Sequence, residues 1–357
     1  MNGYISRIKA IADSLGENDA ALITSDISIT YLTGYQHSEG YVIIGKEDAF
    51  FLVDFRYAEA VQKSVKHINV VVFENYIDSI NDIFKNIGAK SVIVESDAVT
   101  LSTYKNLSEK LSATIIDSPE LSNKIGELRI VKTSDEVEKL RKAQQIAEEA
   151  YLEVLDFVKV GVTEKEISAR LEYLMKLKGA ERVAFELITV TGKKTSLPHG
   201  VPSDNAVKDG DFITFDIGAV YDGYHSDMTR TIGVGNITDE QREIYNIVFD
   251  AHLKALESVK AGVSGFDVDK TARDIITDAG YGKYFGHSTG HGVGLEIHEA
   301  PYAGQRSKDI LKAGMTVTVE PGIYLPDKFG VRIEDTVLVT EDGYETFASI
   351  PKELIII

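Results

Sequence analysis

The chain contains no cysteine among its 357 residues. This absence excludes disulfide bonds, thiolate zinc sites, iron–sulfur clusters and cysteine nucleophiles. Long apolar stretches are also missing, because nowhere do about 18 apolar residues follow one another, and no membrane span is expected. Charges break every apolar run in residues 1–20, so we expect no signal peptide and a cytoplasmic protein.

Basic residues are outnumbered by acidic ones. Lys and Arg total 38 against 56 Asp and Glu, which gives a formal net charge of −18. A chain this acidic is not expected to bind the phosphate backbone of nucleic acid. The hydrophobic fraction of 43% is typical of a folded globular protein, and the length exceeds that of a usual single core, so two domains are predicted.

The first part of the chain alternates apolar runs with helical patterns. Six β-branched or aromatic runs predict strands at 20–24, 41–45, 49–53, 68–73, 91–95 and 113–117. Helical periodicity is present near 3–15, 55–65, 77–87 and 101–111. This alternation indicates an α/β domain, which we place at residues 1–126.

A long helical stretch opens the second domain, predicted at 127–357. Thr133 or Ser134 is a candidate N-cap for a helix that runs to about residue 158. Thr163 and Glu166 fit a capping box for a helix over 164–178. Further helices are predicted at 239–260 and 266–279.

Two acidic residues flank a hairpin signal in this second domain. The Asp222-Gly223 pair is typical of a tight turn between strand-like runs. Folding the chain between Tyr221 and Asp222 predicts that Asp216 lies opposite Asp227, on the same face of the hairpin. That pair alone is also consistent with an ordinary acidic surface hairpin.

A second acidic pair follows the same arithmetic. The turn at 326–328 is centred on Asp327, which places Glu320 opposite Glu334. Both residues lie in strand contexts, where a lone buried glutamate would be costly. The segment GHSTGHGVGLEIHE (286–299) lies between the two hairpins and supplies histidines among glycines, which allow close backbone approach.

The charges of these residues favour a metal site. Four neighbouring carboxylates raise one another's pKa and cannot all ionise unaided. Two divalent ions cancel four negative charges and can hold a bridging water that ionises near neutral pH. An oxygen-rich shell with one imidazole suits Mn²⁺ or Co²⁺, and Zn²⁺ or Fe²⁺ are also compatible.

These segments resemble the metal-dependent pita-bread peptidase superfamily, in particular its proline-peptidase branch of Xaa-Pro dipeptidase and aminopeptidase P. The segment at 128–143 resembles the junction between the two domains of that branch. Five motifs match in order, at 196–204, 216–231, 286–301, 319–324 and 330–340. The resemblance covers essentially the whole chain and implies an α/β creatinase-like N-terminal domain followed by an α+β pita-bread catalytic domain.

The resemblance also implies roles for individual residues. The implied metal ligands are Asp216, Asp227, His291, Glu320 and Glu334, with Asp227 and Glu334 bridging or nearly bridging two ions.

Further roles concern the reaction and the substrate. By the same resemblance, His298 donates to the oxyanion, His199 holds the intermediate or the substrate carbonyl, and Glu320 doubles as the proton shuttle. His287 is expected to line the pocket on the proline side of the substrate. Arg332 is expected either to contact the substrate or to hold a ligand carboxylate. Tyr324 and Thr229 are expected to be pocket residues, and Tyr324 is also expected to contact the substrate.

The implied activity is hydrolysis of the peptide bond preceding proline in short peptides by a dinuclear metallopeptidase, acting as a homodimer. In that dimer the first domain packs over the partner's catalytic domain. One alternative is a metal-free C–N hydrolase of the creatinase type, which is expected to lack ligand residues. A methionine aminopeptidase normally lacks the first domain, and a non-catalytic binding relative is the remaining alternative.

Overall fold

The structure, a computed structural model, describes residues 3–357. The chain divides into two compact units, which separate between Arg129 and Ile130. The boundary predicted at 126/127 lies inside helix α6 (Glu120–Ile130). Within residues 3–357, no helix combines the length and the apolar character needed to cross a membrane.

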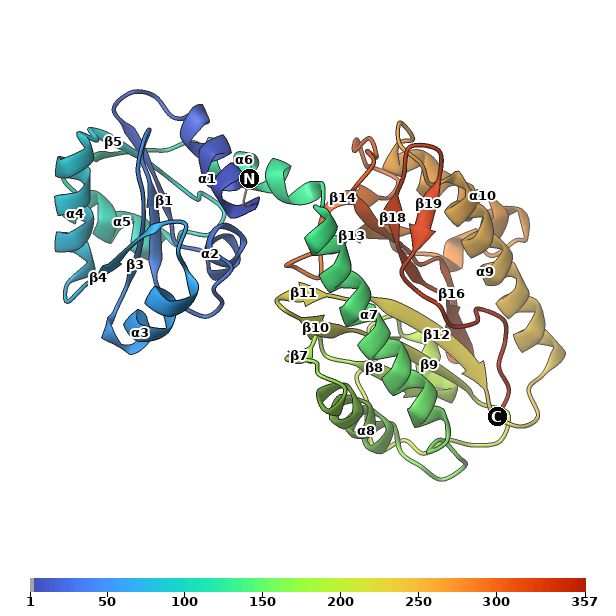
Figure 1. Cartoon of the computed structure of the whole chain (residues 1–357). Helices are drawn as coiled ribbons and strands as arrows, with labels where there is room; N and C mark the ends of the chain where they lie inside the picture. Colours follow the sequence, from blue (N-terminus) through green and yellow to red (C-terminus); the bar gives the residue numbers. More distant parts are fainter. Residues whose placement is uncertain (1–2) are drawn as a thin grey trace. The chain divides into compact units, whose positions relative to one another are not determined.

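A six-stranded mixed sheet forms the centre of the first unit (Figure 1). Its order is β4-β3-β2-β1-β5-β6, with β1–β2 and β2–β3 antiparallel and the other neighbours parallel. All six predicted strands are present. They are β1 (Asp19–Ile23), β2 (Tyr41–Ile44), β3 (Ala49–Val53), β4 (Asn69–Val72), β5 (Ser91–Val94) and β6 (Thr114–Ile116).

Helices lie on both sides of this sheet. Apolar side chains of α4 and α5 pack on one face, whereas α1 and α2 lie on the other (Figure 1). The helices are α1 (Gly3–Ser14), α2 (Asp26–Thr33), α3 (Phe55–Ser64), α4 (Tyr76–Ile87), α5 (Leu101–Lys110) and α6. The sequence patterns missed α2 and α6. The short α2 is rich in β-branched residues and is defined mainly by its ends, the cap Ser25 and the left-handed Gly34.

Four long helices shape the second unit. They are α7 (Ser134–Leu155), α8 (Glu164–Leu177), α9 (Asp239–Ser258) and α10 (Gly265–Asp278). The predicted capping box at Thr163 and Glu166 is present, and Thr133 caps α7 in the same way. The α7–α8 pair packs on the sheet β12-β9-β8, whereas α9 and α10 share a core with β15 to β18 (Figure 1).

The strands of this unit are short and antiparallel. The first group is β7 (Arg182–Val183), β8 (Ile188–Thr191), β9 (Phe212–Ile217), β10 (Ala219–Tyr221), β11 (Tyr224–His225) and β12 (Met228–Gly233). The second group is β13 (Gly290–Gly292), β14 (Glu299–Ala303), β15 (Thr316–Val319), β16 (Gly322–Leu325), β17 (Phe329–Arg332), β18 (Asp335–Val339) and β19 (Tyr344–Thr346). Two 3₁₀ helices, η1 (Gly192–Ser196) and η2 (Gly282–Tyr284), complete it.

The register predicted for the first hairpin is wrong by two residues. Asp216 pairs with Thr229, not with Asp227. The turn is centred between Asp222 and Gly223, which both have positive φ, and not between Tyr221 and Asp222. Two left-handed central residues are the signature of a type I′ turn, so the Asp-Gly pair itself occupies the centre.

The register predicted for the second hairpin is confirmed. Val319 pairs with Asp335 and Gly322 pairs with Arg332, so Glu320 and Glu334 lie opposite each other between these pairs. The turn of residues 326–328 is centred on Asp327, which has positive φ.

The capping box of α8 supports a first prediction. Replacing Thr163 by Ala removes the oxygen that accepts from the Glu166 N–H, so the free energy of unfolding should fall by about 1 kcal/mol. Urea unfolding followed by circular dichroism measures the change. Ser168→Ala in the same helix is the control and should shift stability by less than about 0.5 kcal/mol. Equal losses in both variants would contradict the capping role.

Candidate metal centre

The four predicted carboxylates and His291 line one cavity of about 520 Å³ in the second unit. Asp216 lies on β9, and Asp227 immediately precedes β12. Glu320 follows β15, and Glu334 lies between β17 and β18. Residues more than 100 positions apart therefore meet because two hairpins and the strand of His291 converge on the same space.

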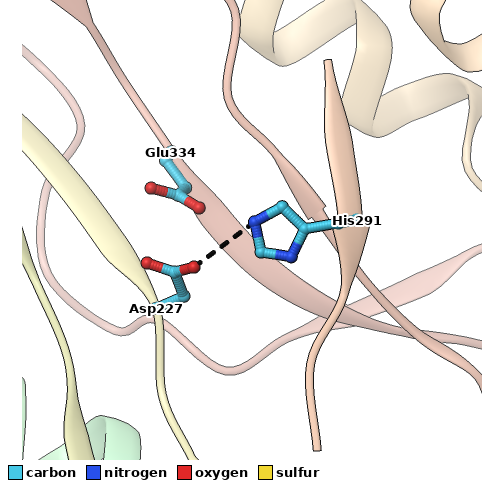
Figure 2. A group of neighbouring side chains, drawn as sticks. All are labelled: Asp227, His291 and Glu334. Carbon is cyan, nitrogen blue, oxygen red and sulfur yellow. Dashed lines mark ion pairs between the residues drawn. The ribbon is translucent and has the colours of Figure 1, made fainter. Parts of the chain in front are cut away.

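The tightest group comprises Asp227, His291 and Glu334 (Figure 2). Each offers one ligand atom, and these atoms lie within 4.8 Å of one another. The Nε2 atom of His291 is 3.5 Å from Asp227 Oδ2 and 3.4 Å from Glu320 Oε1. Such spacing leaves room for a cation between nitrogen and oxygen.

The hydrogen bonds of His291 define which nitrogen faces the carboxylates. Its Nδ1 lies 3.0 Å from the Gly292 carbonyl oxygen, to which it can only donate. Burial lowers the pKa of His291 to about 4, so the imidazole is neutral near neutral pH. The lone pair of Nε2 consequently faces two carboxylates, which is the orientation of a metal ligand held by its other nitrogen.

The side chains that line the cavity compensate only a small part of the negative charge of the four carboxylates. Burial raises the pKa of Asp227, Glu320 and Glu334, and repulsion within the acidic cluster raises it further. Among the described residues that line the cavity, Arg332 is the one Arg or Lys side chain. This donor set of oxygens and one imidazole fits divalent metal ions, which would be held by these residues.

Arg332 connects Asp216 to His287 through the Tyr324 hydroxyl. Its guanidinium donates to Asp216 Oδ2 at 2.6 Å and to the Tyr324 hydroxyl at 2.8 Å. The Nε2 of His287 lies 2.8 Å from the same hydroxyl, and its Nδ1 lies 2.7 Å from the Ser288 carbonyl. Burial, and secondarily Arg332, lowers the pKa of His287 to about 4. The neutral ring therefore donates a hydrogen bond through Nδ1 to the Ser288 carbonyl. Its Nε2 accepts a hydrogen bond from the Tyr324 hydroxyl.

Two threonines fix the directions of the carboxylates. Thr229 donates to Glu334 Oε2 at 2.6 Å and accepts from Arg332 Nε at 3.1 Å. Thr318 accepts from the His291 backbone N–H at 3.0 Å and lies 3.4 Å from Glu320 Oε1. Gly290 permits this approach, because a Cβ there would overlap the Thr318 carbonyl.

The remaining predicted residues also line the cavity. His298 is exposed, and its ring packs edge-on against His291 with centroids 4.4 Å apart. His199 is exposed in the loop that follows η1. The structure thus brings all ten predicted site residues into one region, and their roles stay predictions.

The sequence patterns missed several residues that support this region. Asp269 on α10 is buried, pairs with Arg273 at 2.8 Å and accepts from Thr289. Arg273 in turn donates to the carbonyls of Phe285 and His287 and holds the segment that carries His287. No local pattern marks these residues, because an Asp and an Arg four positions apart on a helix usually form a surface ion pair.

Family models match nearly the whole chain. Residues 138–341 match the model of metallopeptidase family M24, and residues 5–141 match the model of the creatinase/prolidase N-terminal domain. The two matches overlap at residues 138–141, in the first part of α7 and within the second unit.

Similar proteins are named as proline peptidases. The chain is 40% identical to the Xaa-Pro dipeptidase of Pyrococcus furiosus, with 98% of this chain and 99% of that protein covered. Among solved structures, the Xaa-Pro dipeptidase from Bacillus anthracis is 42% identical with a TM-score of 0.95, covering 99% and 100%. The X-Pro aminopeptidase from Thermotoga maritima is 36% identical with a TM-score of 0.90, covering 97% and 99%.

Removal of one carboxylate charge tests the metal centre. Asp227→Asn should lower the number of bound divalent ions by at least one in a calorimetric titration with Mn²⁺, because an amide is neutral and a weaker ligand. Asp222→Asn in the same hairpin turn is the matched control, since Asn also tolerates the positive φ found there. Unchanged binding in Asp227→Asn, or an equal loss in both variants, would contradict the assignment.

Proposed function

Because this chain belongs to metallopeptidase family M24, we propose that it hydrolyses the peptide bond preceding proline in short peptides and releases the N-terminal residue. The observation that carries the proposal is the cluster of four carboxylates and a neutral imidazole in one cavity. The names of the relatives in Pyrococcus furiosus and Bacillus anthracis support proline specificity.

The proposed cofactor is a pair of divalent ions, with Mn²⁺ or Co²⁺ preferred. Asp216, Asp227, His291, Glu320 and Glu334 would hold them. When bound, such a pair polarises the scissile carbonyl and lowers the pKa of the attacking water. The positive charge of two such ions balances the negative charge of four ionised carboxylates.

The proton transfers fall to Glu320. Its carboxylate takes a proton from the attacking water as the oxygen–carbon bond forms, and delivers it to the proline nitrogen as the carbon–nitrogen bond breaks. His298 lies beside His291 and donates a hydrogen bond to the oxyanion that develops on the carbonyl. His199, in the loop that follows η1, helps to hold the tetrahedral intermediate or the substrate carbonyl.

The proline side of the substrate is assigned to His287, Tyr324 and Arg332. The chain of hydrogen bonds from Asp216 through Arg332 and Tyr324 to His287 fixes these side chains relative to the carboxylates. Rigid placement of the proline ring orients the preceding bond for attack.

A homodimer belongs to the same proposal. Sedimentation equilibrium should give a mass about twice the 39.3 kDa of the chain. A monomer at micromolar concentration would contradict this part alone.

Hydrolysis of matched peptides tests the activity. Purified protein should release the N-terminal residue from Xaa-Pro dipeptides or Xaa-Pro-Yaa tripeptides in the presence of Mn²⁺ or Co²⁺. Chelation should abolish release, and added metal should restore it. Peptides with Ala in place of Pro are the control for proline specificity. No release from either proline peptide under any metal would refute the proposal.

Glu320→Gln tests the proton shuttle. An amide cannot accept the water proton, so kcat should fall by about 10²–10⁴-fold. Metal content is measured in parallel, because loss of the carboxylate also weakens a ligand. Glu341→Gln on the exposed surface is the control and should retain full activity. Wild-type kcat in Glu320→Gln would exclude the assigned role.

A further inference from the structure

The segment that carries His287 is attached to helix α10 by side-chain hydrogen bonds. Residues 285–289 join η2 to β13 and form neither helix nor strand. Arg273 on α10 donates to the carbonyl of Phe285 at 2.8 Å and to that of His287 at 2.7 Å. The guanidinium therefore fixes the backbone of the 285–289 segment on either side of residue 286.

Asp269, one turn earlier on α10, holds both Arg273 and the far end of the segment. Its carboxylate accepts from Nε and Nη2 of Arg273 at 2.8 Å each, and the side chains of Asp269 and Arg273 are 1% and 16% exposed. Two parallel hydrogen bonds fix the orientation of a guanidinium. The same carboxylate accepts from the Thr289 N–H at 3.1 Å and from the Thr289 hydroxyl at 2.9 Å. The two residues thus contact the 285–289 segment at both of its ends.

The contacts of Arg273 extend to the ring of His287. The guanidinium carbon lies 4.2 Å from the centre of the Phe285 ring, which is buried. The Phe285 ring in turn packs edge-on against His287, with centroids 5.1 Å apart. His287 itself lines the cavity and bonds to the Tyr324 hydroxyl at 2.8 Å. Both the backbone and the imidazole of His287 are therefore linked to Arg273, although Arg273 does not line the cavity.

We propose that Asp269 and Arg273 form a positioning pair that sets the place of His287, and with it the affinity for the proline side of the substrate. The proposal rests on the role given to His287 in the proposed function. The pair acts through the 285–289 segment and contacts no substrate. Its effect falls on KM, because a contact with the proline side is made in the bound substrate as well as in the transition state.

The first experiment removes the guanidinium. Arg273→Met should raise KM for an Xaa-Pro peptide on the order of tenfold, with kcat within about threefold and the number of bound Mn²⁺ ions unchanged. Lys270→Met is the matched control, because Lys270 forms an exposed ion pair with Asp274 on the same helix. The control should leave KM unchanged. An unchanged KM in Arg273→Met, or an equal rise in the control, would overturn the proposal.

Arg273→Lys separates the geometry of the pair from its charge. Lysine keeps a cation beside Asp269, so thermal stability should stay close to that of the wild type. An ammonium group lacks the planar fork that bonds to a carboxylate through two nitrogens while it donates to two carbonyls. KM should therefore stay raised. A wild-type KM in Arg273→Lys would show that charge alone suffices, and would overturn the positioning role.

Loss of the cation beside the buried Asp269 can also unfold the protein. The double variant Asp269→Asn/Arg273→Met carries neither charge and should fold, because asparagine still offers a carbonyl oxygen to Thr289. It should retain the raised KM, since methionine donates to neither the Phe285 nor the His287 carbonyl. A wild-type KM in this folded double variant would contradict the proposal.

A double-mutant cycle tests whether the pair acts through His287. His287→Ala removes the ring, so adding Arg273→Met to it should raise KM little further. Fully additive increases would show that the pair acts elsewhere, and would overturn the proposal.

A second readout does not depend on activity. The crystal structure of the Asp269→Asn/Arg273→Met variant should show the His287 ring displaced from the Tyr324 hydroxyl, and that of Lys270→Met should show the ring in place. An unmoved ring in the double variant would overturn the positioning pair. A displaced ring, in a protein whose wild type has no peptidase activity, would retain the pair and refute the proposed function.

Discussion

Repulsion among buried carboxylates is the constraint on which the second unit depends. Asp227 and Glu334 are 5% and 2% exposed, and both have a raised pKa because burial and their acidic neighbours disfavour the charged form. Such a cluster must hold protons or bind cations. Metal binding is therefore linked to the integrity of the cavity, because the ions remove the repulsion that the fold otherwise has to withstand.

The scaffold meets this constraint with strands that are fixed from several sides. The helix pairs α7–α8 and α9–α10 cover separate groups of strands (Figure 1). The four carboxylates and His291 lie on these strands or directly next to their ends. A residue next to the end of a strand is held in place by the hydrogen bonds of that strand. Its side chain can nevertheless face a space that is large enough for an ion. Thr229 and Thr318 add the hydrogen bonds that orient the carboxylates.

The sequence predicted the strands of the first unit, the long helices of the second and the residues that share the cavity, and the comparisons confirm the family. Turn chemistry explains where the register argument succeeded. The turn at Asp327 is symmetric about one residue, and Glu320 lies opposite Glu334 as predicted. In the other hairpin the Asp-Gly pair occupies both left-handed positions, so the centre moves by one residue and the pairing of Asp216 by two.

Other features leave no local pattern. The ion pair of Lys132 and Glu299 joins residues 167 positions apart, and neither residue differs from an ordinary surface charge when read alone. The same holds for Asp269, whose partners include Thr289 on a distant segment. Tertiary contacts of single polar residues have no periodicity, so a pattern of spacing cannot reveal them.

The neighbouring acids Glu334 and Asp335 show that the lack of compensation is specific to the cavity. Their side chains point to opposite faces because strand residues alternate. Burial alone would raise the pKa of Asp335, but Arg230, His252 and Lys352 lower it, with Arg230 at 2.7 Å and Lys352 at 2.8 Å. The fold can therefore neutralise a buried carboxylate with side-chain cations, and it does so on one face of this strand. On the other face Glu334 meets further acids and the lone pair of His291, a donor set that fits divalent metal ions.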